Sequence, residues 1–224
     1  MRVRTFLAVA AFATTSLSLG ACANQGHDSP GTTSTVAETP SPPSAYSSAV
    51  WPIESGPLRY ATPEQAAQGF ATDYLKISNP VIDSFQQGDS RSGEVPIRPT
   101  STGPVTTVMV RQLGSASSWW VVGAGTDAIQ LSEPKWGASI SSPVALVGAA
   151  GVFEGTVQTQ IRQSDDGATV LGAGIVTGGM AMTPFSGVLT FSKPSTQRGA
   201  VVLFTLSPKD GSVLEASVTQ ITFG

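Results

Sequence analysis

The sequence predicts a mainly β protein in which a small α+β domain, with one helix on an antiparallel sheet, is followed by a β-sandwich. Three observations predict this fold class. Charged residues make up only 12% of the 224 residues, and 24 glycines and 16 prolines are typical of a turn-rich β protein. Helical periodicity occurs in one short stretch. In the last third of the chain, short alternating runs are separated by turn signals.

Residues 1–21 have the layout of a bacterial export signal peptide. Two arginines precede an apolar run from Phe6 to Phe12, which is too short to span a membrane. The following Leu19-Gly20-Ala21-Cys22 resembles the lipobox of bacterial lipoproteins, in which a peptidase cuts before a cysteine that already carries diacylglycerol. The resemblance implies lipidation of Cys22, with acyl chains such as palmitate anchoring the protein to the extracytoplasmic face of the cell membrane. The alternative is an ordinary secretory signal with a chance cysteine.

The charge and cysteine content exclude several classes of protein. Cys22 is the only cysteine, so the chain forms no internal disulfide and its stability must come from packing. Removal of residues 1–21 leaves 10 basic and 15 acidic residues, a formal charge of −5. The basic residues are scattered singly and form no phosphate-binding stripe. We therefore expect no nucleic-acid partner.

Residues 22–50 are predicted to be the lipidated cysteine and a disordered tether. Of the 28 residues from 23 to 50, 16 are Ser, Thr, Pro or Gly, and bulky apolar side chains are almost absent. Such a segment buries too little surface to offset the entropy lost on ordering.

Residues 51–132 are predicted to form the small α+β domain. Thr62, Pro63 and Gln65 supply an N-cap, a proline at the first helical position and a capping-box glutamine. Asn79-Pro80 is expected to end the helix. Six residues at three- and four-residue spacing form its buried face: Ala66, Ala67, Phe70, Ala71, Tyr74 and Leu75. Three β-like runs follow: Gly93–Arg98, Val105–Leu113 and Ser118–Ala124.

Trp119 and Trp120 lie next to each other in the last of these runs. Adjacent residues on a strand point to opposite faces, so only one of the two easily enters a single core. The other must be covered by the helix, by the second domain or by a ligand. We therefore keep both tryptophans as candidate binding residues, with core packing as the alternative.

Residues 138–224 are predicted to form the β-sandwich. Apolar and polar residues alternate from Val157 to Arg162 and again from Phe185 to Ser192, with Gly-, Asp- and Pro-containing turns between such runs. Along the last run, the apolar positions change from even to odd residue numbers, and this change predicts a bulge near Thr219.

Several separated motifs in this region resemble a known family. They are Ile140–Pro143, Gly148, Val152–Val157, Pro184–Gly187, Leu203-Phe204 and Ser207–Ser212. In order and spacing they resemble the immunoglobulin-like domain of bacterial spore germination, the second domain family associated with germination modules, over about residues 138–224. The Ala, Gly and Thr richness of the chain also fits an actinobacterial source.

This resemblance implies an immunoglobulin-like sandwich without disulfides, of the kind found outside the cytoplasm in envelope lipoproteins and spore-related proteins. It implies a binding or structural role and no known catalysis. The usual neighbouring domain of germination proteins is not evident in residues 51–132, so the resemblance predicts no specific role in germination.

No catalytic, cofactor or metal site is predicted. His27, the only histidine, lies in the tether, so a Ser-His-Asp or Cys-His arrangement has no ordered base and zinc has too few ligands. An enzyme that uses carboxylates alone would have to draw on four acidic residues, for which solvation is the better explanation: Asp73, Asp83, Asp89 and Glu94.

Phe153 and Glu154 are further candidate binding residues, at the start of a predicted strand. We expect the Glu154 carboxylate to accept hydrogen bonds from loop amides, and ligand binding is the alternative. Together, these observations predict a non-enzymatic envelope lipoprotein whose immunoglobulin-like domain contacts a protein or glycan partner outside the cell. The alternative function is a carrier that holds a small apolar ligand in residues 51–132.

Overall fold

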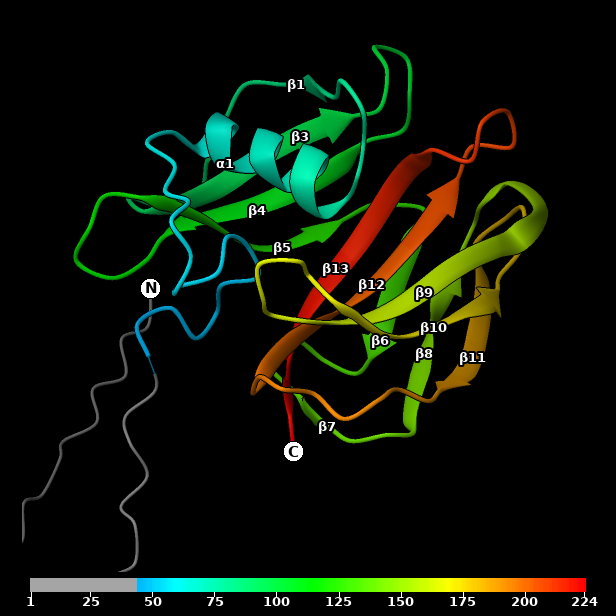
Figure 1. Cartoon of the computed structure of the whole chain (residues 1–224). Coiled ribbons are helices and arrows are strands. Elements are labelled where there is room, and N and C mark those ends of the chain that lie inside the picture. The colour runs from blue at the N-terminus through cyan, green and yellow to red at the C-terminus, as the bar shows by residue number, and fades with distance from the viewer. Residues whose placement is uncertain (1–43) are drawn as a thin grey trace, which may run out of the picture. The chain divides into compact units, whose positions relative to one another are not determined.

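Residues 44–224, which the computed structural model describes, are built almost entirely from antiparallel strands, with one short helix on a face of the larger sheet (Figure 1). The predicted fold class is confirmed: the region is mainly β, with a small α+β part and an immunoglobulin-like sandwich. The predicted signal peptide, lipobox and Cys22 lie outside the described residues.

The single helix begins as its sequence predicts. It consists of α1 (Pro63–Gly69) and a π-helical turn, η1 (Phe70–Tyr74). Thr62 Oγ1 accepts a hydrogen bond from the Gln65 amide at 3.2 Å, and Gln65 Oε1 accepts one from the Ala61 amide. All six residues of the predicted apolar face are buried. The helix ends before the predicted Asn79-Pro80, since Lys76 already has a φ of 65°.

Two sheets make up the rest. The ten-stranded sheet has the order β1-β3-β4-β5-β13-β12-β9-β10, with β2 paired to β3 and β7 paired to β13. The first part of this sheet contains β1 (Val81–Ile82), β2 (Gln86–Gln87), β3 (Ser92–Arg98), β4 (Thr106–Gln112) and β5 (Trp119–Gly125). The remainder contains β7 (Ser139–Ile140), β9 (Thr156–Gln163), β10 (Val170–Thr177), β12 (Arg198–Leu206) and β13 (Val213–Phe223).

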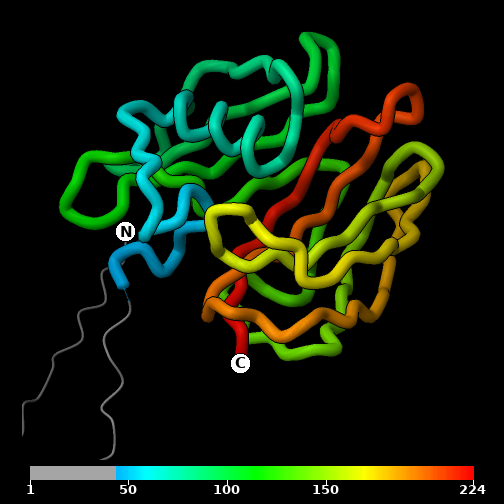
Figure 2. The backbone as a smooth tube through the Cα atoms, viewed as in Figure 1, coloured from blue at the N-terminus to red at the C-terminus, as the bar shows by residue number. Residues whose placement is uncertain are grey.

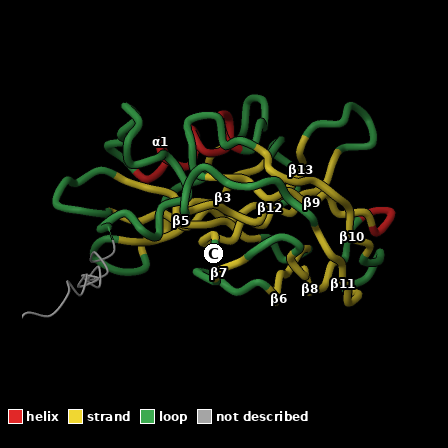
Figure 3. Tube along the Cα trace, turned by 60° about the horizontal axis from the view of Figure 1, so that its bottom comes forward, coloured by secondary structure: helices red, strands yellow, loops and turns green. Residues whose placement is uncertain are grey.

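The second sheet completes the sandwich. It has the order β11-β8-β6 and contains β6 (Ile129–Glu133), β8 (Val144–Ala150) and β11 (Thr183–Leu189). Gly148 of β8 is required there, because a Cβ would lie 2.2 Å from the Gln130 carbonyl oxygen and 2.6 Å from the Phe185 ring. Figure 3 shows the resulting layers, with α1 on one side of the large sheet and β6, β8 and β11 on the other.

The central strands β12 and β13 are covered on both faces. In β12, Val202 and Phe204 belong to the core under the helix, whereas Val201 and Leu203 belong to the core of the sandwich. In β13 the even-numbered Ala216 and Val218 face the first core, and Ile221 faces the second. The change in apolar parity therefore comes from two different cores, and the predicted bulge near Thr219 is wrong. The irregularity lies at Leu214, where the pairing shifts between Val213 and Glu215.

Side chains join the two parts of the large sheet where β5 meets β13. Only one residue pair, Ala124 with Val218, aligns these strands. Beside it, the Ala216 amide donates to Thr106 Oγ1 at 3.0 Å, and Thr126 Oγ1 donates to the Glu215 carboxylate. The strand β6, which lies in the range predicted for the first domain, pairs with β8 of the sandwich.

Residues 44–54 also pack against the folded region (Figure 2, blue). The Tyr46 ring lies 4.7 Å from the Trp120 ring, and Ala49 and Val50 are buried. Arg198 of β12 donates to the Tyr46 carbonyl and forms an ion pair with Glu54. The segment 44–50 therefore differs from the prediction that the disordered tether extends to residue 50, because it contributes apolar surface of its own.

A buried arginine ties the helix to the sandwich. Arg162 Nη1, on β9, donates to the Tyr74 carbonyl at 2.5 Å, and the guanidinium lies 4.9 Å from the centre of the Tyr74 ring. Its Nε donates to Gln160 Oε1 at 2.8 Å. Burial raises the pKa of Tyr74 to about 12, although the positive charge of Arg162 acts in the opposite direction.

This raised pKa predicts a loss of stability in alkali. The folded protein holds the phenol proton more tightly than the unfolded chain, in which the tyrosine has its ordinary pKa of 10.0. The contribution is therefore fully present below pH 10 and is lost as the pH rises toward 12. We expect Tyr74→Phe to flatten the decline in the free energy of unfolding above pH 10, as measured by urea denaturation. Tyr46→Phe, which retains Tyr74, should keep the steep decline, and identical profiles for both variants would contradict the assignment.

Candidate functional site

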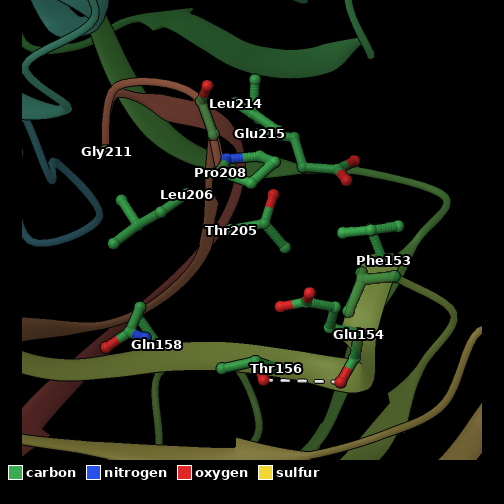
Figure 4. Close-up of a pocket in the computed structure, with 12 residues that line it drawn as sticks. Phe153, Glu154, Thr156, Gln158, Thr205, Leu206, Pro208, Gly211, Leu214 and Glu215 are labelled. Atoms are coloured by element: carbon green, nitrogen blue, oxygen red, sulfur yellow. Dashed lines mark hydrogen bonds between the residues drawn. The ribbon is translucent and has the colours of Figure 1, made fainter.

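A cleft of about 650 Å³ lies at one end of the sandwich (Figure 4). It is formed between the 3-10 turn η2 (Phe153–Gly155) that precedes β9 and the turn that joins β12 to β13. Its walls are Val152, Phe153, Glu154, Thr156, Gln158, Thr205, Leu206, Ser207, Pro208, Gly211, Leu214 and Glu215. Two of the four candidate binding residues, Phe153 and Glu154, therefore line this cleft.

The turn η2 holds Glu154 in an uncommon backbone conformation. Glu154 has a φ of 57° and Gly155 a φ of 67°, both in the left-handed region that disfavours side chains. Gly155 is required for a second reason, because a Cβ would lie 3.0 Å from the Gly178 carbonyl oxygen. Strain at a residue other than glycine persists where the surrounding structure imposes it, and such positions cluster at ligand sites.

The Glu154 carboxylate does not make the predicted hydrogen bonds. Among residues 44–224, no hydrogen bond reaches this carboxylate, and Glu154 takes part only through its carbonyl oxygen, which accepts from Thr156 Oγ1 at 3.4 Å. Figure 4 shows the carboxylate directed toward the middle of the cleft. The expected bonds to loop amides are therefore absent from the described region.

Two polar groups in the cleft are more than nine-tenths buried. Thr205 is 7% exposed, and its hydroxyl has no hydrogen-bond partner. Glu215 is 8% exposed, and its one hydrogen-bond partner in the described region is the Thr126 hydroxyl. A buried hydroxyl without a partner and a buried carboxylate without a cation are both unfavourable in isolation. The cleft therefore presents polar groups that a ligand would satisfy.

The other walls of the cleft are largely apolar. Phe153 is 65% exposed and Leu206 41% exposed, and Pro208 and Leu214 also line the cleft. The ion pairs within residues 44–224 join Arg98 to Asp83, Lys135 to Glu133 and Arg198 to Glu54, and none involves a residue of the cleft. The cleft is therefore apolar and negatively charged.

Trp119 and Trp120 do not lie in this cleft. As predicted, they point to opposite faces of β5. Trp119 packs edge-on against Phe85 at 5.2 Å on the helix side. Trp120 is 1% exposed on the other face, between Tyr46 and the Arg59 guanidinium, which lies 5.0 Å from its ring. Both are packing residues, and the segment 44–50 supplies the cover that Trp120 required.

Three of the acidic residues considered for carboxylate chemistry have local structural partners. Asp83 pairs with Arg98, and Asp73 accepts a hydrogen bond from the Thr72 hydroxyl. Asp89 accepts from the Arg91 amide at 2.7 Å, and this bond lowers its pKa. Glu94 lines a shallow groove beside Met109.

No group of three His, Cys, Asp or Glu side chains in residues 44–224 is placed to hold a metal ion. No helix of this range is both long and apolar enough to cross a membrane.

Thr205 and Glu215 escaped prediction from the sequence. Thr205 stands among the apolar residues of β12, where an uncharged β-branched residue looks like part of the core. Glu215 looks like an ordinary exposed strand residue until the bulge at Leu214 and the neighbouring Thr126 bury it.

Comparisons with known proteins agree with the geometry of the sandwich. The model of the family described as the immunoglobulin-like domain of bacterial spore germination matches residues 128–212. The predicted resemblance is therefore confirmed, and the match begins with the residues of β6. No curated protein and no solved structure matches the chain. Two of the family motifs, Val152–Val157 and Ser207–Ser212, contribute residues to the cleft.

The buried hydroxyl of Thr205, which has no hydrogen-bond partner, is predicted to lower the stability of the free protein. Thr205→Val replaces the hydroxyl by a methyl group of similar size, so we expect the free energy of unfolding to rise by about 1 kcal/mol. Thr106→Val is the matched control, because its hydroxyl accepts a hydrogen bond from the Ala216 amide. It should lower stability by about 1 to 2 kcal/mol. Chemical denaturation measures both changes, and a loss of stability in Thr205→Val would show that its hydroxyl is already satisfied.

Proposed function

We propose that this chain is a non-enzymatic lipoprotein of the bacterial cell envelope. In this proposal, acyl chains on Cys22 anchor it to the extracytoplasmic face of the membrane. The immunoglobulin-like domain then binds a protein or glycan partner through the cleft between η2 and the β12–β13 turn. The single observation that carries the binding role is the cleft itself, with exposed apolar walls around two buried and incompletely satisfied polar groups.

The exposure of Phe153 supports a partner of substantial size. Ligand sites typically combine an apolar lining with a few polar groups that orient the ligand. Phe153 projects at the rim with 65% of its surface exposed, which is unfavourable for an isolated aromatic side chain but suited to contact with another molecule. The cleft and its rim together therefore fit a binding surface.

The chemistry of the site supports binding rather than catalysis. The residues that line the cleft include no histidine, cysteine or lysine, so it has none of the side chains that most often activate or act as a nucleophile at neutral pH. Its two carboxylates lie on the turn η2 and on β13, and one of them is already engaged by Thr126. The carrier alternative gains no support, since both tryptophans that would line its cavity are used in packing.

The anchoring part of this proposal is tested at Cys22. Cells that express the chain with Cys22 should incorporate a radiolabelled fatty acid into it, and the protein should sediment with membranes. Cys22→Ser removes the sulfur to which acyl chains are attached, so it should abolish the label and release the protein from the membrane fraction. Substitution of a neighbouring residue, Asn24→Ser, is the control. Retention of the label in Cys22→Ser would contradict lipidation at this position.

The binding part is tested by photo-crosslinking in living cells. A benzophenone side chain placed at position 153 should give discrete products that contain envelope protein or glycan, because this position lies at the rim of the cleft. Val188 is 72% exposed and lies outside the cleft, so the same substitution there is the control. Identical products from both positions, or none from position 153, would argue against partner binding through the cleft.

A further inference from the structure

The carboxylate of Glu215 is the strongest indication of what the cleft binds. The residue is 8% exposed, and the Thr126 hydroxyl is the one hydrogen-bond partner of the carboxylate within residues 44–224. Buried carboxylates in proteins are normally paired with a cation or held by several donors. None of the ion pairs of the described region reaches it. No cation of the described region therefore neutralises Glu215.

Two further polar groups lie around the same space. The Thr205 hydroxyl, also more than nine-tenths buried, has no partner, and the Glu154 carboxylate is directed into the cleft without any hydrogen bond (Figure 4). A hydroxyl oxygen and two carboxylates together offer acceptors. A ligand that satisfies them must bring hydrogen-bond donors, and a ligand that also neutralises the two carboxylates must bring positive charge.

The apolar walls define the rest of the ligand. Leu206, Pro208 and Leu214 offer no side-chain hydrogen-bonding group, so they suit an alkyl chain. Phe153 offers an exposed aromatic face at the rim, where it can pack on flanking apolar residues or on a guanidinium plane. A sugar, by contrast, presents hydroxyl groups that these walls would leave unpaired.

We propose that the cleft binds a lysine or arginine side chain within a peptide segment of a protein partner. The proposal rests on the proposed function and adds the chemical class of the ligand. The cation pairs with Glu215 and is held by the negative charge of Glu154, and the Thr205 hydroxyl accepts one of its N–H groups. The alkyl stem lies along Leu206 and Leu214. Phe153 covers the flanking residues.

Binding of pooled peptides to the full chain tests this proposal. Each pool contains blocked heptapeptides with randomised flanks and one fixed central residue: lysine, arginine, N-acetyl-lysine or glutamate. We expect the lysine and arginine pools to be retained at least about tenfold better than the other two, because only these carry the required charge. Equal retention of the lysine and acetyl-lysine pools would overturn the proposal.

Charge-neutral variants show whether the cleft is responsible. Glu215→Gln and Glu154→Gln should each weaken retention of the lysine pool by about tenfold or more. Glu154 is exposed on a turn, so its variant keeps the test valid even where Glu215→Gln disturbs folding. Glu94→Gln removes the same charge from outside the cleft and should leave retention within about twofold. Equal losses in all three variants would assign the effect to net charge and overturn the proposal.

Failure of this proposal can be distinguished from failure of the proposed function. Soluble neutral glycan fragments form a further arm of the same binding experiment. Retention of glycans with no preference for cationic peptides would overturn the lysine or arginine assignment while supporting a binding cleft. Crosslinking at position 153 without a preference for cationic peptides would also overturn the lysine or arginine assignment and support a binding cleft. If neither peptides nor glycans bind and position 153 gives no crosslinked product, both proposals fall.

Discussion

The structure depends on the burial of two neighbouring strands, β12 and β13, on both of their faces. Residues 199–205 of β12 are all buried, and alternate side chains enter different cores. A strand in the middle of an ordinary half-exposed sheet needs apolar residues on one face only, whereas these strands need them on both. Burial of a large aliphatic side chain contributes roughly 1.5 to 3 kcal/mol. Removing either covering layer would therefore expose an apolar face that the chain has no other means to cover.

This shared pair of strands makes the helix side and the sandwich parts of one structure. The helix face with Phe70 and Tyr74 packs over residues such as Val202 and Ala216, which belong to sandwich strands. Where regular pairing between β5 and β13 stops, Thr106 and Arg162 supply hydrogen bonds between the two parts. Buried polar groups are costly without partners, so these contacts favour one relative placement over others.

The main elements could be predicted from the sequence because they depend on local patterns. The capping residues Thr62 and Gln65 specify the start of the helix, and alternation specifies β3 to β5 and the strands of the sandwich. The sequence also shows that the apolar residues of β13 change from even to odd positions. It does not show the cause, because the pattern along one strand does not say which core each of its faces contacts. The role of Tyr46 in covering Trp120 depends on a contact between residues 74 positions apart, and it lies in a segment whose composition resembles a tether.

The residues of the cleft could be predicted only in part, because some of them depend on contacts between distant parts of the chain. Phe153 and Glu154 stood out because an aromatic and an acidic residue precede a glycine at the start of a strand. Thr205 and Glu215 become unusual only when tertiary structure buries them.

Native structures satisfy nearly all buried polar groups, so a buried polar group without a partner needs an explanation. At the cleft, three unusual features coincide: a strained Glu154 backbone, a Thr205 hydroxyl without a partner and a Glu215 carboxylate without a cation. The other buried polar atoms without a partner in the described region, Trp51 Nε1 and Trp120 Nε1, lie outside the cleft. All three features of the cleft lower the stability of the free protein, and a cationic ligand would relieve the two that involve polar groups. Local rules of folding are broken most often at functional sites, and the bulge at Leu214 next to Glu215 fits the proposed binding role of the cleft.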